Sequence, residues 1–146
     1  MTDALSEPIF IDTNILLYAH GVSEDDPRAG RARDVLTQLW RTENGVLSTQ
    51  VLQEFYAVAT KKLKPPLPGS KARGLVAAYT DWCTVPTDPA LIVAAGALAE
   101  QHTLAFWDAL IVEAALRAGA ARLLSEDLQH GRRFGSLLIE NPLLDT

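Results

Sequence analysis

The chain has 146 residues, 48% of them hydrophobic, a single cysteine, and a formal net charge of −5 at pH 7. This size and apolar content favour one domain spanning residues 1–146, and the negative charge argues against a protein that coats nucleic acid by electrostatic attraction alone. The lone cysteine excludes an internal disulfide and a cysteine-based metal cluster, while the lack of a long apolar run or a basic leader predicts a cytoplasmic protein without a membrane span.

The first predicted element is a short buried strand at residues 9–11, which read Ile-Phe-Ile. Consecutive β-branched and aromatic residues are typical of a strand that is covered on both faces. The strand stops at Asp12, and the residues from Thr13 onward have the pattern of a helix. Two interpretations of Asp12 are open at this point: it caps the helix, or it is a ligand-binding carboxylate at the carboxyl end of a parallel strand.

The remainder of the chain alternates helices with short strands. Asp26-Pro27 and Asp88-Pro89 each combine an N-cap with a proline in the first turn, and they predict helices that end near residues 44 and 101. The prolines of 64–69 exclude helix there. Further helices are expected over 50–63, from a Ser70 cap to 79–82 and over 106–118, and strands at 46–48, 83–85, 121–124 and 137–139. This alternation predicts an α/β fold with a short central parallel sheet flanked by helices on both faces.

Asp108 is a carboxylate in an unexpected position. Leu104, Ile111, Val112 and Ala115 lie at helical spacings from it, so Asp108 shares the inward, apolar face of its helix. No Lys or Arg lies three or four residues away to pair with it. Stabilisation by the helix dipole explains an aspartate in the first turn but not its choice of face, so a functional role is favoured.

Two more carboxylates extend this pattern. Glu54 flanks the apolar face of the helix over 50–63 without a neighbouring cation, although an ordinary surface glutamate fits equally well. Asp127 follows an apolar strand, as Asp12 does, and the carboxyl ends of parallel strands meet at one edge of a sheet. Clustered carboxylates repel one another unless a cation is present, and oxygen ligands without His or Cys suit Mg²⁺ or Mn²⁺. This favours phosphodiester or phosphoryl chemistry, and the absence of a Walker-type glycine-rich loop argues against a nucleotide-triphosphatase.

Four segments, taken in order, resemble PIN-domain ribonucleases, and within them the toxins of VapBC-type toxin–antitoxin pairs. They are I-F-I-D-T-N-I-L-L-Y, L-S-T-Q-V-L-Q-E-F, F-W-D-A-L-I-V-E-A-A and L-L-S-E-D-L-Q-H-G. No single segment is specific, but their order and spacing agree over essentially the whole chain. The resemblance implies an acidic site made of Asp12, Glu54, Asp108 and Asp127, with the metal on Asp12, Asp108 and Asp127 and support from Thr13, Asn14 and Ser125.

The resemblance also implies an activity: metal-dependent endonucleolytic cleavage of RNA that leaves 5′-phosphate and 3′-hydroxyl ends. The metal would acidify a bound water, and Glu54 would orient or deprotonate that water or help to hold a second metal. A homodimer and a VapB-type antitoxin are the implied partners, with the antitoxin supplying DNA binding. The candidate partner contacts in this chain are Leu36, Leu39, Trp40, Phe55 and Tyr56.

Residues near Asp127 leave several choices open. Glu126 adjoins it, and strand alternation prevents both side chains from facing the site in the same way; Asp127 is favoured because it matches the hydroxyl-x-Asp pattern of the family. His130, Arg132 and Arg133 are candidate contacts to the RNA backbone, although loop residues of this kind are more often simply solvated.

Two other functions compete with the nuclease interpretation. A haloacid-dehalogenase-type phosphohydrolase also has an aspartate at a strand end, but it needs a second one two residues later, where this chain has Asn14. A non-catalytic binding module on a degenerate PIN fold has no reason to keep mutually repelling carboxylates.

Trp107, beside Asp108, has two interpretations. It either stacks on a base or is a core or interface residue, and the second interpretation is favoured.

Overall fold

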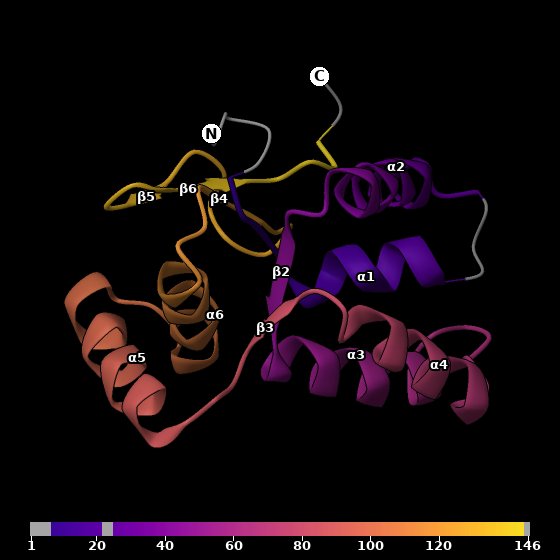
Figure 1. The fold of residues 1–146 in the computed structure, drawn as a ribbon, viewed down its shortest axis with the longest axis horizontal. Helices are drawn as coiled ribbons and strands as arrows, with labels where there is room; N and C mark the ends of the chain where they lie inside the picture. The colour runs from indigo at the N-terminus through magenta and orange to yellow at the C-terminus, as the bar shows by residue number, and fades with distance from the viewer. Residues whose placement is uncertain (1–6, 22–24, 145–146) are drawn as a thin grey trace.

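The computed structural model describes residues 7–21 and 25–144 (Figure 1). The polar stretch at 21–26 is predicted from the sequence to be a loop, and its residues 22–24 lie outside the described residues. The elements are β1 (Ile9–Ile11), α1 (Thr13–His20), α2 (Pro27–Thr42), β2 (Gly45–Ser48), α3 (Thr49–Lys61), α4 (Gly69–Tyr79), β3 (Cys83–Val85), α5 (Pro89–His102), α6 (Phe106–Arg117), β4 (Arg122–Leu124), β5 (Arg133–Phe134) and β6 (Leu137–Glu140). None of the described helices is long and apolar enough to cross a membrane.

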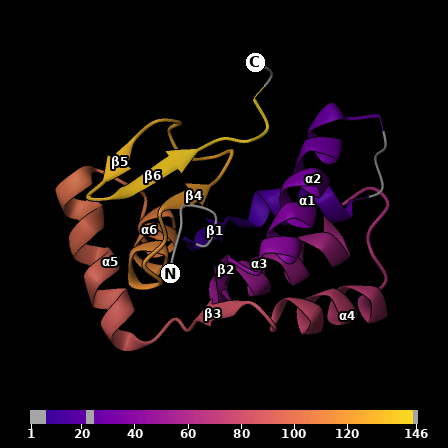
Figure 2. The same cartoon turned by 45° about the horizontal axis from the view of Figure 1, so that its top comes forward.

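The strands form one sheet in the order β3-β2-β1-β4-β6-β5, which Figure 2 presents from bottom to top. β1 lies in the middle and pairs in parallel with β2 and β4, with Phe10 opposite Val46 on one side and Leu123 on the other. Only β5 runs antiparallel, against β6. The predicted α/β fold with a central, mostly parallel sheet is confirmed, and β5 is the element that the sequence did not predict.

The helices cover the sheet on both faces, as the parallel connections require. The chain steps from β1 to β2 to β3 in one direction and then returns to β4 on the other side of β1. Because such crossovers are right-handed, the outward and return connections pack on opposite faces. Figure 1 shows this arrangement, with α1 to α4 on one side of the sheet and α5 and α6 on the other. β1 is therefore enclosed, and Phe10 and Ile11 have no exposed surface.

Local capping accounts for several helix starts. The side chains of Asp26 and Asp88 accept hydrogen bonds from Arg28 N (3.0 Å) and Leu91 N (2.8 Å), which confirms both predicted caps. The predicted Ser70 cap is wrong, because α4 begins at Gly69 and its N-cap is Pro68, two residues before Ser70, without a side-chain hydrogen bond.

The predicted partner contacts change once burial is known. Leu36, Leu39 and Phe55 are buried in the core, so they cannot contact a partner in this conformation. Trp40 and Tyr56 are 39% and 37% exposed, so these two remain candidate partner contacts.

Candidate active site

The carboxyl ends of the central strands bring the predicted site residues together. Asp12 follows β1 and Ser125 follows β4, and the two strands are neighbours in the sheet. The backbone N–H of Asp12 donates to the carbonyl of Leu124 at 3.0 Å, so the pairing continues past the end of β1. This is the place at which a parallel sheet reverses its strand order, and such crevices are where open α/β sheets bind ligands.

Asp12 caps α1, which is one of the two roles that its sequence position allowed, and it also contacts the residue after β4. Its Oδ1 accepts the backbone N–H of Thr13 at 2.7 Å, which caps α1. Its Oδ2 accepts the hydroxyl of Ser125 at 2.7 Å, across 113 residues of sequence. Only 7% of Asp12 is exposed, and this burial raises the pKa of its carboxyl to about 6. Those two hydrogen bonds oppose the rise, and the charges of Asp127 and Glu54 add to it. The charges of two other predicted site carboxylates therefore act directly on the carboxyl group of Asp12.

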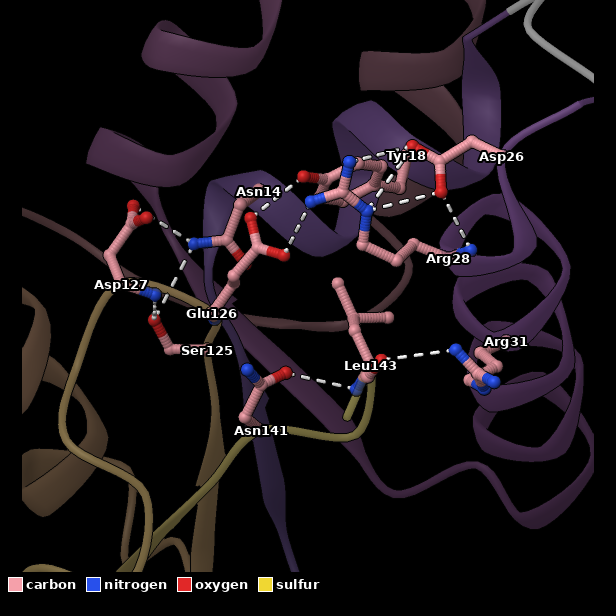
Figure 3. Close-up of polar contacts among 10 residues, drawn as sticks. All are labelled: Asn14, Tyr18, Asp26, Arg28, Arg31, Ser125, Glu126, Asp127, Asn141 and Leu143. Carbon is pink, nitrogen blue, oxygen red and sulfur yellow. Dashed lines mark hydrogen bonds and ion pairs between the residues drawn. The ribbon is translucent and has the colours of Figure 1, made fainter. Parts of the chain in front are cut away.

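Asn14 and Ser125 hold the segment after β4 against the start of α1 (Figure 3). The Asn14 amide donates to Asp127 Oδ2 at 3.1 Å, and its carbonyl oxygen accepts the backbone N–H of Glu126 at 3.1 Å. The Ser125 hydroxyl also accepts the backbone N–H of Asp127 at 3.1 Å. Neutral donors therefore lie between Asp12 and Asp127 and offset their repulsion.

The structure separates Glu126 from Asp127. Glu126 turns toward α1 and α2, where its carboxylate accepts the Tyr18 hydroxyl at 2.7 Å and pairs with Arg28 at 3.2 Å. Arg28 also pairs with Asp26 at 2.8 Å. Figure 3 shows Asp127 on the other side of Asn14 from this ion-pair network. The carboxylate directed at the predicted site is that of Asp127, because its neighbour is fully engaged elsewhere.

Glu54 belongs to the cluster through α3. Its Oε2 accepts the Thr13 hydroxyl at 3.1 Å, and its Oε1 accepts the side-chain amide of Gln50 at 2.7 Å. The same Gln50 nitrogen lies 3.3 Å from the carbonyl oxygen of Trp107, so it joins α3 to the first turn of α6. Gln50 is buried, and sequence analysis missed it. Its position four residues before Glu54 on one helix face was the available signal.

Asp108 lies half-buried in the first turn of α6, as its helix spacing indicated. Partial burial raises the pKa of its carboxyl, and the charges of Asp127 and Glu54 raise it further. Among residues 7–21 and 25–144, no side chain or backbone group donates a hydrogen bond or forms an ion pair with this carboxylate. The four predicted acidic residues thus share one electrostatic environment, in which Asp108 is left without a counter-charge.

The donor set fits a hard divalent cation. Carboxylate, hydroxyl and amide oxygens surround the cluster, and such oxygens are the ligands of Mg²⁺ and Mn²⁺. Within the described part of the chain, no three His, Cys, Asp or Glu side chains already stand close enough to enclose an ion. Mg²⁺ keeps several of its waters and uses one or two carboxylates directly, so an open cluster of acids is compatible with it.

The predicted substrate contacts near residue 130 are engaged in local structure. His130 Nδ1 accepts the backbone N–H of Asn141 at 3.0 Å. Arg132 donates to the carbonyl of His102 at 3.2 Å, and its guanidinium lies 4.7 Å from the centroid of the Phe134 ring. Arg133 is exposed on β5. None of the contacts found among the described residues joins these three to the acidic cluster, and their binding of RNA stays a prediction.

Comparisons with known proteins agree with this architecture. A search of curated proteins found no significant match, but solved structures with the same fold exist. VapC20 of Mycobacterium tuberculosis, described as a toxin that cleaves the sarcin–ricin loop, shares 21% identity over 82% of this chain and 91% of its own, with a TM-score of 0.61. A toxin–antitoxin complex from Klebsiella pneumoniae shares 16% identity over 92% of this chain and 97% of that one (TM-score 0.67).

A third structure, VapBC2 of Rickettsia felis bound to a promoter DNA fragment, shares 20% identity over 91% of this chain and 97% of that chain, with a TM-score of 0.61. At these identities the likeness concerns the fold. The sequence itself gives the stronger result, because the family model described as the PIN domain matches residues 9–133. The chain therefore belongs to the PIN domain family.

Proposed function

We propose that this chain is a metal-dependent endoribonuclease, a nuclease domain comprising residues 1–146 that acts in the cytoplasm as the toxin of a type II toxin–antitoxin pair. The observation that carries the proposal is the convergence of Asp12, Glu54, Asp108 and Asp127 at the carboxyl edge of the sheet, where burial and mutual repulsion raise the pKa values of Asp12 and Asp108. A protein gains nothing in stability from such a cluster. The cost is explained if a cation and a phosphodiester bind there.

Asp12, Asp108 and Asp127 would hold Mg²⁺ or Mn²⁺, which when bound supplies an acidified water and neutralises charge on the reacting phosphate. Glu54 would orient or deprotonate the attacking water, and hydrogen bonds from Thr13 and Gln50 to its two oxygens support this role by holding its carboxylate in place. Asn14 and Ser125 keep Asp12 and Asp127 in position before the cation arrives. Attack in line with the leaving oxygen would yield 5′-phosphate and 3′-hydroxyl ends.

Cleavage of a mixed pool of structured RNAs tests the activity. Wild-type protein is expected to cut in Mg²⁺ or Mn²⁺ and not in EDTA, and Asp12→Asn and Asp108→Asn are expected not to cut. Asp81→Asn is the matched control, because Asp81 is an exposed aspartate that lies beside Gly45 at the amino end of β2. Metal-independent cutting, or equal cutting by Asp12→Asn, would count against the proposal. Hydrolysis of small phosphomonoesters instead of RNA would favour the phosphohydrolase, and RNA binding without cleavage would favour the binding module.

Similarity to toxins solved with their antitoxins supports the partner side of the proposal. The net charge of −5 suits a division of labour in which a VapB-type antitoxin binds DNA and a homodimer of this chain binds RNA. Expression of this chain alone is expected to arrest growth, and co-expression of the antitoxin is expected to relieve the arrest. Arrest by Asp12→Asn as strong as by wild type would contradict a toxin role for the catalytic site.

A further inference from the structure

Trp107 is the most exposed aromatic side chain among the described residues. Its exposed fraction is 66%, compared with 39% for Trp40 and 37% for Tyr56. An indole in water forgoes the stabilisation that its burial would give, since an aromatic side chain buries a large apolar area. The core interpretation of this residue is therefore wrong.

The position of Trp107 is fixed relative to the acidic cluster. It directly precedes Asp108 in the first turn of α6, and its carbonyl oxygen accepts the Gln50 amide that also holds Glu54. Its ring leans edge-on against Phe106, with 5.4 Å between the ring centroids and 69° between the planes. Phe106 in turn packs against the core. The ring is thus a platform supported by Phe106, and it belongs to the residue next to Asp108 in the first turn of α6.

Because the protein is negatively charged, an aromatic platform can contribute RNA affinity that electrostatic attraction does not. The net charge is −5, so general attraction to the phosphate backbone is weak. Arg28, which contacts the segment after β4, is already paired with Asp26 and Glu126. A stacking contact gains binding energy without positive charge, and every unpaired base offers a flat face to an aromatic ring.

We propose that Trp107 stacks on an unpaired RNA base next to the scissile phosphate and so adds RNA affinity that the net charge of −5 does not supply. The inference rests on the proposed ribonuclease function for its position relative to the cut. Bases in a duplex are already stacked on their neighbours, and only a splayed base can lie on the indole. Trp107 is thereby assigned as a substrate-binding residue that contacts a base and not the backbone.

Binding in EDTA tests the stacking contact without cleavage. The probe is a labelled oligouridine, with an RNA duplex of matched length as the second ligand. Trp107→Ala is expected to weaken oligouridine binding about 5- to 150-fold, the Kd change that corresponds to loss of one base–aromatic stack. Trp107→Phe keeps a ring and is expected to retain most of the affinity, and duplex binding is expected to be weak in all variants.

Intrinsic fluorescence supplies the second readout. Oligouridine is expected to quench wild type and Trp40→Phe similarly and Trp107→Phe much less, since Trp40 lines a separate cavity with Asn44 and Gly45 at the amino end of β2. Trp40→Phe is thus the matched control for an exposed tryptophan.

The outcomes distinguish failure of the stacking inference from failure of the proposed ribonuclease activity. If Trp107→Ala binds oligouridine and cleaves RNA like wild type, the stacking inference is overturned while the nuclease stands. If that variant keeps its RNA affinity but changes the sedimentation coefficient, Trp107 belongs to a protein interface and the inference is again overturned. If wild type binds through Trp107 but never cleaves with metal, the inference is supported and the proposed activity fails. If wild type does not bind oligouridine in EDTA, the stacking inference is overturned, and cleavage in Mg²⁺ decides the proposed activity separately.

Discussion

Asp12, Asp108 and Asp127 show what single residues in this chain disclose. The sequence places each at a strand end or on the apolar face of a helix, and that was enough to predict them as site residues. Local pattern alone did not distinguish Asp127 from Glu126, and only the family resemblance favoured Asp127. The contacts that occupy Glu126 come from Tyr18 and Arg28, about a hundred positions earlier in the chain. Gln50 was missed for the same reason, since its partner Trp107 lies 57 residues away. Local pattern finds the carboxylates, and tertiary contact decides their orientation.

At the residue scale, we predict that Asp108→Asn makes the metal-free protein more stable while removing activity. The folded state raises the pKa of Asp108, so above that pKa the charged carboxylate opposes folding. The neutral amide removes the repulsion from Asp127 and Glu54. Thermal unfolding in EDTA at neutral pH is expected to give a higher Tm for the variant, by up to about 4 °C. Added Mg²⁺ is expected to stabilise wild type more than the variant. A lower Tm for Asp108→Asn in EDTA would contradict the electrostatic account of the cluster.

At the scale of elements, strong local signals gave most of the helices. Asp88-Pro89 predicted α5 and Asp26-Pro27 predicted α2, because an N-cap followed by proline is a property of a few adjacent residues. β5 was not predictable, since its two residues, Arg133 and Phe134, are too short for any periodicity and are defined by their pairing with β6. The Ser70 cap was wrong by two residues, since the N-cap of α4 is Pro68, and helix boundaries are usually uncertain by one or two residues.

Packing of β2 against the segment before β3 gives a prediction for two glycines. A Cβ at Gly45 would lie 2.6 Å from the ring of Trp82, which is itself buried. Gly45→Ala is therefore expected to cost about 1–3 kcal/mol, the range for overpacking a core. A Cβ at Gly74, within α4, meets nothing within 4 Å, and Gly74→Ala is expected to add about 0.5–1 kcal/mol. Urea unfolding measures both, and equal stabilities for the two variants would show that Trp82 can move aside.

Packing of α1 against α4 gives a pH prediction. Burial lowers the pKa of His20, and the charge of Lys71 lowers it further. The ring accepts or donates a 2.7 Å hydrogen bond with Tyr79, which is also buried. Because the unfolded chain binds a proton more readily than the folded one, this residue costs stability as the pH falls below about 6.5.

His20→Phe isolates the effect of His20 protonation on stability, since a ring still fills the site beside Phe55 and Tyr79. The difference in unfolding free energy between wild type and variant is expected to shift in favour of the variant on going from about pH 7.5 to about pH 5.5. His130→Gln is the control, because His130 is exposed in a loop. A pH-independent difference for His20→Phe would show that His20 stays neutral in both states.

At the scale of the whole molecule, the order of strands creates the candidate site. Reversal of direction at β1 and β4 opens the carboxyl edge between helices from both faces, and Asp12, Glu54, Asp108 and Asp127 reach it from four separate elements. The sequence indicated the alternation of helices and strands but not the sheet order, which depends on pairing over long separations.

Single-turnover cleavage of one mapped RNA in Mg²⁺ tests the central claim, that these carboxylates act as one site. Each of Asp12→Asn and Asp108→Asn is expected to lose about 100-fold or more in rate, and the double variant no more than the slower single variant, because groups that act as a unit are not additive. Asp81→Asn, purified in the same way, is expected to match wild type. Losses that multiply in the double variant, or a loss in Asp81→Asn as large as in Asp12→Asn, would contradict a shared metal-dependent site.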